Sequence, residues 1–285
     1  MRLSVVIPVH NRPGPLAEQL EGLAGQRFAG VWEVIVADNG STDATVSVAA
    51  SFAGRLPLRV IDASARRGKP FAVNQAAISA RGESLILLDS DDVVARGFLS
   101  AMAEALDGAT FVGARLDVRL LNPAWLLARR PPLQETGLPR WIDDRPMVVG
   151  AGMGVNRAAF LQVGGLDERL HCQEDLDLSW RLQDAGHHPH FVPDAVVHYR
   201  YRQELRDIWR QERRYGRYEA ALFAKHRPRA LPTARRVRRA AAGWLQVLRA
   251  VPGAGAPAGR ARLVTVVAAA VGRAEGSLRD RVLYL

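Results

Sequence analysis

Three carboxylates lie within four positions of the sequence, in the stretch DSDD at residues 89–92, directly after the apolar run LILL. Side chains two positions apart in a strand point to the same side, so Asp89 and Asp91 would face one ligand while Asp92 points elsewhere. Two oxygen ligands suit Mg²⁺ or Mn²⁺, which often complete their coordination with water and substrate phosphates. A solvated acidic turn would have the same sequence. Like charges this close repel, so on the metal interpretation a cation is needed to neutralise the cluster.

Two polar loops precede this cluster. The stretch DNGSTD at residues 38–43 could contact a base edge, or could begin a helix with Ser41 or Thr42 as the N-cap. The stretch RGK at residues 67–69 precedes another predicted helix, where a phosphate would meet two cations and the amide groups of the helix N-terminus. A solvated basic turn is the structural alternative. Neither loop alone decides between binding and structure.

A second acidic site follows at Glu174 and Asp175, with His198 further along the chain. A carboxylate beside an acceptor hydroxyl can remove its proton during attack, while a metal stabilises a departing phosphate. Acidic residues in the first turn of a helix are also favoured by the helix dipole alone. His198 could be a third metal ligand or a structural histidine, and the residue type leaves both open.

The elements that must position these residues alternate between strands and helices. Apolar, β-branched runs predict strands at residues 3–9, 31–37, 58–61, 84–88, 111–120 and 191–197, and helical spacing predicts helices at 16–23, 70–80, 203–223 and over QEDLDLSWRLQD. Such alternation implies crossover connections and a mostly parallel sheet. In open sheets of this kind, ligands bind beyond the carboxyl ends of the strands, where the polar loops lie.

Composition indicates a folded chain with an appended basic segment. With 285 residues and 48% hydrophobic content, the chain can form one large α/β domain plus an extension. Residues 200–240 contain 14 Lys/Arg and 4 Asp/Glu, so this segment alone accounts for the net charge of +10. An anionic lipid surface, an acidic substrate or nucleic acid would be attracted to it.

Cysteine usage and the apolar stretches bear on localisation. The single cysteine, Cys172, cannot form an intrachain disulfide, and the N-terminal residues lack a secretory signal, so a reducing cytoplasm is expected. The apolar stretches in 241–285 are too short to span a bilayer, which takes roughly 20 residues. They could lie in a membrane interface or pack against the domain, and the sequence does not decide between these.

The order of the motifs is more informative than any one of them. The series VVIPVHNR, VADNGSTD, RRGKPFAVNQA, ILLDSDD, GAGMGVNRAAF, VGGLDE and QEDLDLSWRL strongly resembles the nucleotide-sugar-dependent glycosyltransferases of family 2, which have the GT-A fold. The resemblance covers about residues 1–200, and the region beyond matches nothing as specific. It implies a Rossmann-like, mixed but mostly parallel sheet flanked by helices in residues 1–200, with a nucleotide-binding half (1–92) and an acceptor half (93–200), followed by a basic helical C-terminal extension (201–285).

The resemblance also implies site residues. The donor would bind at Pro8, His10, Asn11, Asp38, Arg67, Gly68, Lys69, Asp89 and Ser90, with Asp38 reading the base. Asp91 and Asp89 would hold a divalent metal, Mg²⁺ or Mn²⁺, and His198 would complete its site. The acidic cluster would then stay poorly neutralised until metal and donor bind. Asp175 of the Glu174–Asp175 pair would be the general base. The acceptor side would include Gly152, Met153, Gly165 and Asp167.

These implications predict an inverting, metal-dependent transfer from a UDP-, GDP- or dTDP-linked sugar to a hydroxyl acceptor, such as a cell-envelope glycan, a glycolipid or a secondary metabolite. Asn39 and Arg67 differ from residues common in relatives, which leaves the base open. A lipid-linked acceptor and peripheral contact of residues 200–285 with the inner face of the membrane fit the basic extension. No nucleic-acid partner is expected, and the oligomeric state is not readable. The alternatives are a sugar nucleotidyltransferase and a non-catalytic module that binds lipid or nucleic acid.

Overall fold

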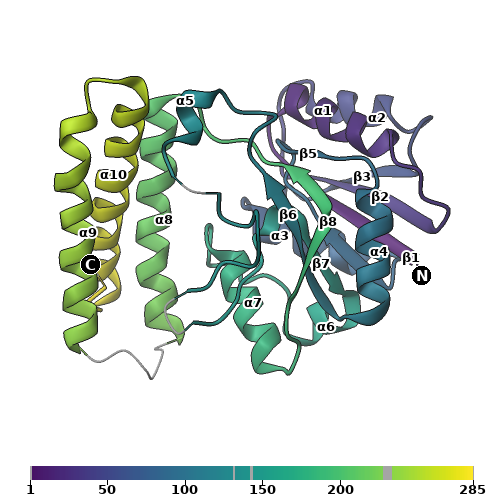
Figure 1. The fold of residues 1–285 in the computed structure, drawn as a ribbon. Coiled ribbons are helices and arrows are strands. Elements are labelled where there is room, and N and C mark those ends of the chain that lie inside the picture. The colour runs from purple at the N-terminus through teal and green to yellow at the C-terminus, as the bar shows by residue number, and fades with distance from the viewer. Residues whose placement is uncertain (1, 131, 142–143, 227–232, 285) are drawn as a thin grey trace. The chain divides into compact units, whose positions relative to one another are not determined.

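The computed structural model describes residues 2–130, 132–141, 144–226 and 233–284, and it divides the chain into two compact units (Figure 1). The first unit comprises Met1–Leu120, Pro132–Pro139 and Pro146–Arg200, and the second comprises Leu121–Pro131, Arg140–Arg145 and Tyr201–Leu285. The longest segment of the second unit begins at Tyr201. The short stretches 121–131 and 140–145, which were expected in the first domain, group instead with the second unit.

An eight-stranded sheet organises the first unit, in the order β3-β2-β1-β4-β7-β6-β8-β5. β1 pairs in parallel with β2 and β4, β2 with β3, and β6 with β8, whereas β7 runs antiparallel to β4 and β6, and β5 antiparallel to β8. The mixed, mostly parallel sheet expected from the alternating pattern is therefore present. The strands are β1 (Arg2–Val9), β2 (Val31–Asp38), β3 (Leu58–Asp62), β4 (Ser84–Leu87), β5 (Val93–Val94), β6 (Phe111–Asp117), β7 (Met153–Asn156) and β8 (His190–His198).

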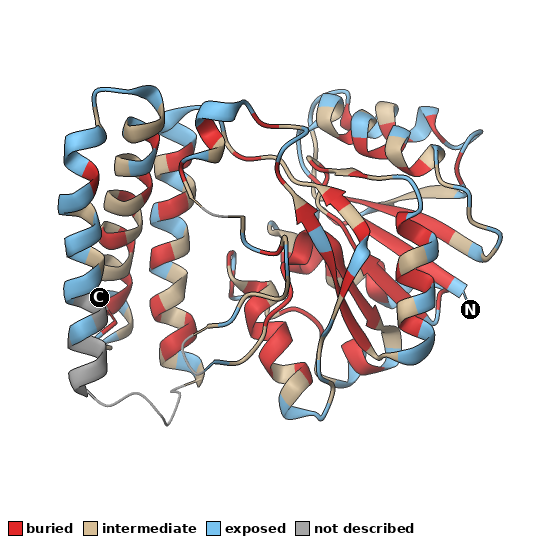
Figure 2. Ribbon diagram, viewed as in Figure 1, coloured by how far each residue is buried: buried red, intermediate tan, exposed pale blue. Residues whose placement is uncertain are grey.

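Helices cover both faces of this sheet. Val6, Ile35 and Leu85 share one buried cluster with side chains of α3, α6 and α7, while the alternate strand residues Val5 and Val34 are also fully buried. Because successive strand side chains point to opposite faces, burial of both sets requires cover on each side. Figure 2 shows the central strands as buried along most of their length. The helices of this unit are α1 (Pro13–Ala24), α2 (Thr45–Ser51), α3 (Lys69–Ser79), α4 (Phe98–Gly108), the 3-10 turn η1 (Gly150–Gly152), α6 (Arg157–Gln162) and α7 (Glu174–Asp184).

The second unit is helical, with α5 (Ala124–Leu127), α8 (Leu205–His226), α9 (Thr233–Ala250), η2 (Val251–Gly253) and α10 (Pro257–Asp280). α10 packs against both α8 and α9. Glycine lets it approach α8 closely, because a Cβ on Gly276 would lie 2.5 Å from the carbonyl oxygen of Arg217. Within the described part of the chain, no helix is both long and apolar enough to cross a membrane.

Three local expectations differ from the structure. α2 begins at Thr45 with Ala44 at its N-cap and no side-chain cap, so neither Ser41 nor Thr42 caps it. β6 ends at Asp117 rather than at residue 120. β4 ends at Leu87, so the DSDD residues lie in the following turn, and the side-chain alternation of a strand does not apply to them.

Candidate active site

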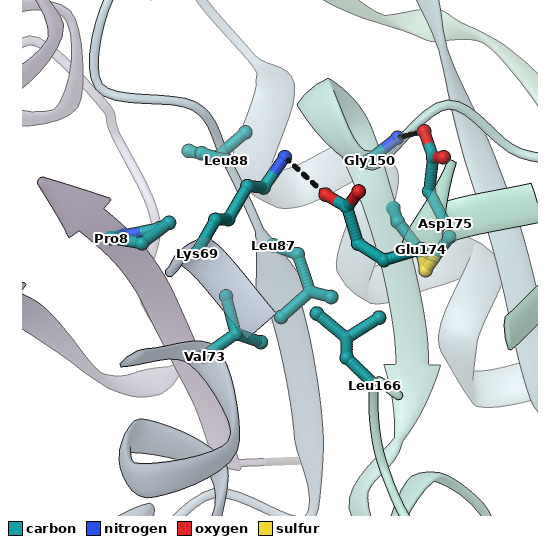
Figure 3. Close-up of a pocket in the computed structure, with 10 residues that line it drawn as sticks. Pro8, Lys69, Val73, Leu87, Leu88, Gly150, Leu166, Glu174 and Asp175 are labelled. Atoms are coloured by element: carbon teal, nitrogen blue, oxygen red, sulfur yellow. Dashed lines mark hydrogen bonds and ion pairs between the residues drawn. The ribbon is translucent and has the colours of Figure 1, made fainter. Parts of the chain in front are cut away.

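A pocket in the first unit lies at the carboxyl ends of β1 and β4, beside the N-termini of α3 and α7 (Figure 3). Strands, helices and loops distant in sequence all contribute to it. Its lining residues are Pro8, Lys69, Val73, Leu87, Leu88, Gly150, Met153, Leu166, Glu174 and Asp175. The polar groups are one ammonium and two carboxylates, set against an apolar wall.

Lys69 is the cation of this pocket. Its Nζ lies 2.6 Å from Asp89 Oδ1 and 3.4 Å from Glu174 Oε1, so it joins the DSDD turn to α7. Burial alone would lower the pKa of Lys69, but the charges of Asp89, Glu174 and Asp175 raise it well above its ordinary value. The acidic turn is therefore already partly neutralised by the protein, contrary to the expectation that it would wait for metal and donor.

Glu174 and Asp175 open α7 and differ in environment. Glu174 is buried, and this burial raises the pKa of its carboxyl; the charge of Lys69 opposes the rise and that of Asp175 adds to it. Asp175 is partly exposed, and its Oδ2 accepts a hydrogen bond from the Gly150 amide at 2.9 Å (Figure 3). Gln173, immediately before them, has a φ of 63°, a left-handed conformation that costs energy for a non-glycine residue.

The DSDD turn is fixed by side chains on other elements. Gln19 on α1 is fully buried, and its Nε2 donates to the Asp89 carbonyl oxygen at 3.1 Å while its Oε1 accepts from the Val94 amide at 3.0 Å. Arg200 donates through its backbone amide to Asp92 Oδ1 at 2.8 Å and through Nε to the Asp91 carbonyl oxygen at 2.9 Å. The pocket side of the turn therefore carries Asp89, and the opposite side is anchored through Asp92.

Asp92 has the loop-supporting position expected for it. It is buried, and its Oδ2 has no hydrogen-bond partner among the described residues. Burial, followed by the charges of Asp91 and Asp89, raises the pKa of Asp92 well above its ordinary value. Ser90, between the two proposed ligands, is also buried.

The loops after β1 and β2 are bound together by short polar side chains. Asp38 accepts hydrogen bonds from the Ser41 amide on both carboxylate oxygens, at 3.2 and 3.1 Å. Asn11 has a φ of 51°. Its side-chain Oδ1 accepts a hydrogen bond from the Thr42 backbone amide, and its backbone amide donates one to Ser41 Oγ. His10 is exposed. Asn11 thus connects the end of β1 to the loop after β2.

Asn39 connects that region to the lysine. Its Nδ2 donates to the carbonyl oxygens of Ala63 and Arg66 at 2.6 and 2.7 Å, and its Oδ1 accepts from the Gly68 amide at 2.8 Å. Gly68 has a φ of 130°, a conformation that L side chains rarely adopt, and it begins α3 directly before Lys69. Arg67, directly before Gly68, is exposed. Asn39 therefore fixes the loop that places Lys69 in the pocket.

His198 lies near the turn, but its ring contacts another residue. His198 is opposite Val93 in the β5–β8 pair, directly after DSDD, and its Nδ1 lies 3.1 Å from Asp117 Oδ2. Over residues 2–130, 132–141, 144–226 and 233–284, no three His, Cys, Asp or Glu side chains form a group that could hold a metal ion. Asp89, Asp91 and His198 are accordingly not assembled as a ready-made three-ligand cage.

The expected acceptor-side residues have different surroundings. Met153 lines the pocket, whereas Gly152 packs against β6, where a Cβ would lie 2.9 Å from that of Ala114. Gly165 has a φ of 68°, and the next residue, Leu166, reaches the pocket. Asp167 forms an ion pair with Arg169 at 2.9 Å. The structure thus brings Met153 to the pocket and gives Gly152 and Gly165 backbone roles.

Sequence reasoning missed Gln19, Asn39 and Arg200 as supports of the site. For Gln19 a signal existed, because it lies on the buried stripe of α1 with Leu16, Leu20 and Leu23, where a polar side chain requires a partner. Asn39 was considered as part of a loop that could contact a base edge and as a departure from the common motif, and not as a support of Lys69. Arg200 was counted only as part of a basic segment.

Comparisons with known proteins cover most of the chain. Residues 4–164 match the family model described as glycosyl transferase family 2, and residues 142–255 match the one described as glycosyl transferase family group 2. The second match extends past residue 200, where the sequence motifs had suggested no specific resemblance. The family models therefore include part of the second unit.

Individual relatives agree with the family models. The pre-mycofactocin glycosyltransferase of Mycobacterium tuberculosis is 30% identical over 240 residues, covering 81% of this chain and 49% of the relative. The succinoglycan biosynthesis protein ExoA of Rhizobium meliloti is 27% identical over 247 residues, covering 82% of this chain and 73% of the relative. The chain thus spans about half the length of the mycobacterial relative.

Solved structures share the fold. The mannosyltransferase PcManGT from Pyrobaculum calidifontis, in complex with GDP-Man and Mn²⁺, superposes with a TM-score of 0.70 at 20% identity, covering 96% of this chain and 86% of that chain. TarS 1–349 of S. aureus in complex with UDP gives a TM-score of 0.58 at 18% identity, with coverages of 99% and 92%. At these identities, the likeness establishes the GT-A fold.

Proposed function

Because this chain belongs to glycosyl transferase family 2, we propose that it transfers a sugar from a nucleoside diphosphate sugar to a hydroxyl acceptor, with inversion at the anomeric carbon. The observation that carries the proposal is one pocket at the carboxyl ends of β1 and β4 that combines Asp175, Glu174 and Lys69, with Asp89 in contact with the lysine. In this proposal, residues 1–200 form the catalytic domain and residues 201–285 form a basic helical extension.

Asp175 is the proposed general base. The Gly150 amide binds one of its oxygens and thereby fixes the carboxylate at the pocket wall, while partial exposure leaves it accessible to an acceptor. The acceptor oxygen bonds to the anomeric carbon as its proton passes to Asp175. The bond from that carbon to the diphosphate oxygen breaks, and the diphosphate leaves with the electron pair. Glu174 is the worse base candidate, because it is buried and faces Lys69.

The donor is proposed to bind between the loops after β1 and β2 and the N-terminus of α3. Asp38 would contact the base, and Lys69, Arg67 and the amide groups at the start of α3 would face the diphosphate, since helix N-termini favour anions. Lys69 would then exchange part of its contact with Asp89 for a contact with phosphate. The complexes of PcManGT with GDP-Man and of TarS with UDP support a nucleotide-linked donor.

A divalent ion fits the DSDD turn only together with the donor. Asp89 and Asp91 offer hard oxygen ligands, and Mg²⁺ or Mn²⁺ sites commonly use one or two carboxylates plus substrate phosphates. The lack of a three-ligand group among the described residues agrees with that arrangement. A bound ion would stabilise negative charge on the leaving diphosphate. His198 stays a candidate ligand, because Asp117 at its Nδ1 is the kind of partner that orients metal-binding histidines.

The test combines a donor panel with one substitution. UDP-, GDP- and dTDP-linked sugars are incubated with the protein, with and without Mn²⁺, and release of nucleoside diphosphate is followed. Asp175→Asn should lower turnover by at least about a thousandfold while donor binding, measured by calorimetry, changes by less than about threefold. Asp107→Asn, an exposed aspartate on α4 outside the pocket, is the matched control and should behave as the parent.

Two outcomes would contradict the proposal. Substantial turnover in the Asp175→Asn protein would remove Asp175 from the role of base. Release of pyrophosphate from a nucleoside triphosphate and a sugar phosphate, with no reaction of any nucleotide sugar, would instead identify the sugar nucleotidyltransferase considered as an alternative.

A further inference from the structure

Four exposed large apolar side chains of the second unit lie close together and form a row. Trp244, Leu245, Leu248 and Val251, on α9 and the turn after it, are 48%, 43%, 68% and 54% exposed. The other exposed large apolar residues of the described chain are spread from Val31 to Leu283, and no other stretch of eight residues contains four of them. Isolated exposed apolar residues need no explanation, but a contiguous group indicates an interaction surface.

This row is not the face by which α9 packs. Gly243, Val247 and Ala250, spaced four and three residues apart, are the less exposed residues among those of α9 whose burial is described. A Cβ on Gly243 would lie 3.2 Å from the guanidinium of Arg273 on α10. Trp244, Leu248 and Val251 have the same helical spacing, but they lie about a quarter turn away. Figure 2 shows α9 as exposed over most of its described length. Its apolar row therefore faces outward within the unit.

The charge of the helix indicates what would cover this row. The 18 residues of α9 include five arginines and no Asp or Glu. Arg238 precedes the row and Arg249 lies between Leu248 and Val251, and both are exposed. Over residues 201–285, the sequence contains 19 Lys/Arg and 6 Asp/Glu. A partner must therefore offer negative charge around an apolar interior.

We propose that α9 lies in the interface of an anionic lipid bilayer, with Trp244, Leu245, Leu248 and Val251 inserted between the headgroups and its arginines among the lipid phosphates. Amphipathic helices of this composition lie parallel to the membrane plane, and their binding increases with buried apolar area and with anionic lipid content. The chemistry of the row separates lipid from nucleic acid, since a phosphate backbone offers nothing to two leucines and a valine.

The experiment uses the full chain and sedimentation with vesicles, and it needs no glycosyl transfer. We expect strong binding to vesicles of phosphatidylglycerol and phosphatidylcholine, and at least about tenfold weaker binding to pure phosphatidylcholine. The double variant Trp244→Gln, Leu248→Gln should lose about tenfold or more in partitioning into the anionic vesicles. Lipids brominated in the acyl chains should quench part of the tryptophan fluorescence of the parent, and this part should disappear in Trp244→Phe.

Leu278→Gln is the matched control, because Leu278 is 82% exposed on α10 of the same unit but lies outside the row. It should bind vesicles as the parent does. Equal loss in this control and in the double variant would overturn the proposal, as would equal binding to neutral and anionic vesicles or no binding to either. A concentration-dependent dimer that the double variant abolishes, without vesicle binding by the parent, would assign the row to a second copy of the chain. Salt-sensitive binding to nucleic acid alone would also overturn it.

Discussion

Gln19→Leu tests whether α1 sets the position of the DSDD turn. The change keeps side-chain size but removes the hydrogen bonds to the Asp89 carbonyl oxygen and the Val94 amide. Val94 is buried, so its amide would lose its partner without access to water, at about 1–3 kcal/mol. The bond to the Asp89 carbonyl oxygen is only partly buried, so water can replace part of it, and about 1 kcal/mol is expected there. The free energy of unfolding should fall by about 2–4 kcal/mol.

The functional consequence separates positioning from stability. Since the turn carries Asp89 and Asp91, loss of its anchor should raise the Mn²⁺ concentration for half-maximal transfer and the donor KM by about tenfold, which corresponds to about 1.4 kcal/mol. Nucleoside diphosphate release measured over a Mn²⁺ titration gives the first quantity, and urea unfolding gives the stability. Both measurements are made well below the unfolding temperature of the variant.

Gln26→Leu is the matched control. Gln26 lies just after the C-terminus of α1 and makes bonds of the same kind, donating to the Ala95 carbonyl oxygen at 2.9 Å and accepting from the Leu99 amide at 3.3 Å. It should lose comparable stability, about 1–3 kcal/mol, without changing the Mn²⁺ requirement. If both variants shift that requirement equally, or if neither does, the assignment of Gln19 to the turn is refuted.

Two other polar side chains give predictions. Asn39→Asp would replace an amide that donates to two loop carbonyl oxygens with a carboxylate that cannot donate. The donor KM, measured by steady-state kinetics, should rise severalfold, and the free energy of unfolding, measured in urea, should fall by about 1–3 kcal/mol. An unchanged donor KM would argue against a role of Asn39 in placing Lys69. For Glu33, burial acts to raise the pKa, but hydrogen bonds from Arg81, Ser4 and Arg59 outweigh it and lower the pKa below its ordinary value. The stability from this lowered pKa is present above about pH 4 and is lost as pH falls through the folded value. Glu33→Gln should therefore cost about 1–3 kcal/mol at pH 7, and the gap to the parent should narrow below about pH 4 in unfolding curves; a constant gap would contradict the assignment.

Local patterns predicted the parts of the fold that local physics determines. The apolar run of β1 and the helical spacing in α3 are set by burial and periodicity, which are visible within ten residues of sequence. The end of β4 was predicted one residue late, because Leu88 is as buried as the strand before it. The cap of α2 was misassigned, because Ser41 is used instead by Asn11 and Asp38. A polar residue that serves a distant loop looks, in sequence, like one that serves its own helix.

The same limitation explains what was missed at the candidate site. Each charged residue can be identified in the sequence by itself, and its type suggests what it could bind. It does not show that Lys69 reaches Asp89 and Glu174 at once, because that depends on where Gly68 starts α3 and where α7 begins. With the lysine in this position, the protein itself supplies a counter-charge at the acidic turn. A donor diphosphate entering with its ion would therefore replace an internal ion pair and would not meet bare carboxylates. The net gain from the ion is then smaller than the charge of the turn suggests, because an existing contact must be given up.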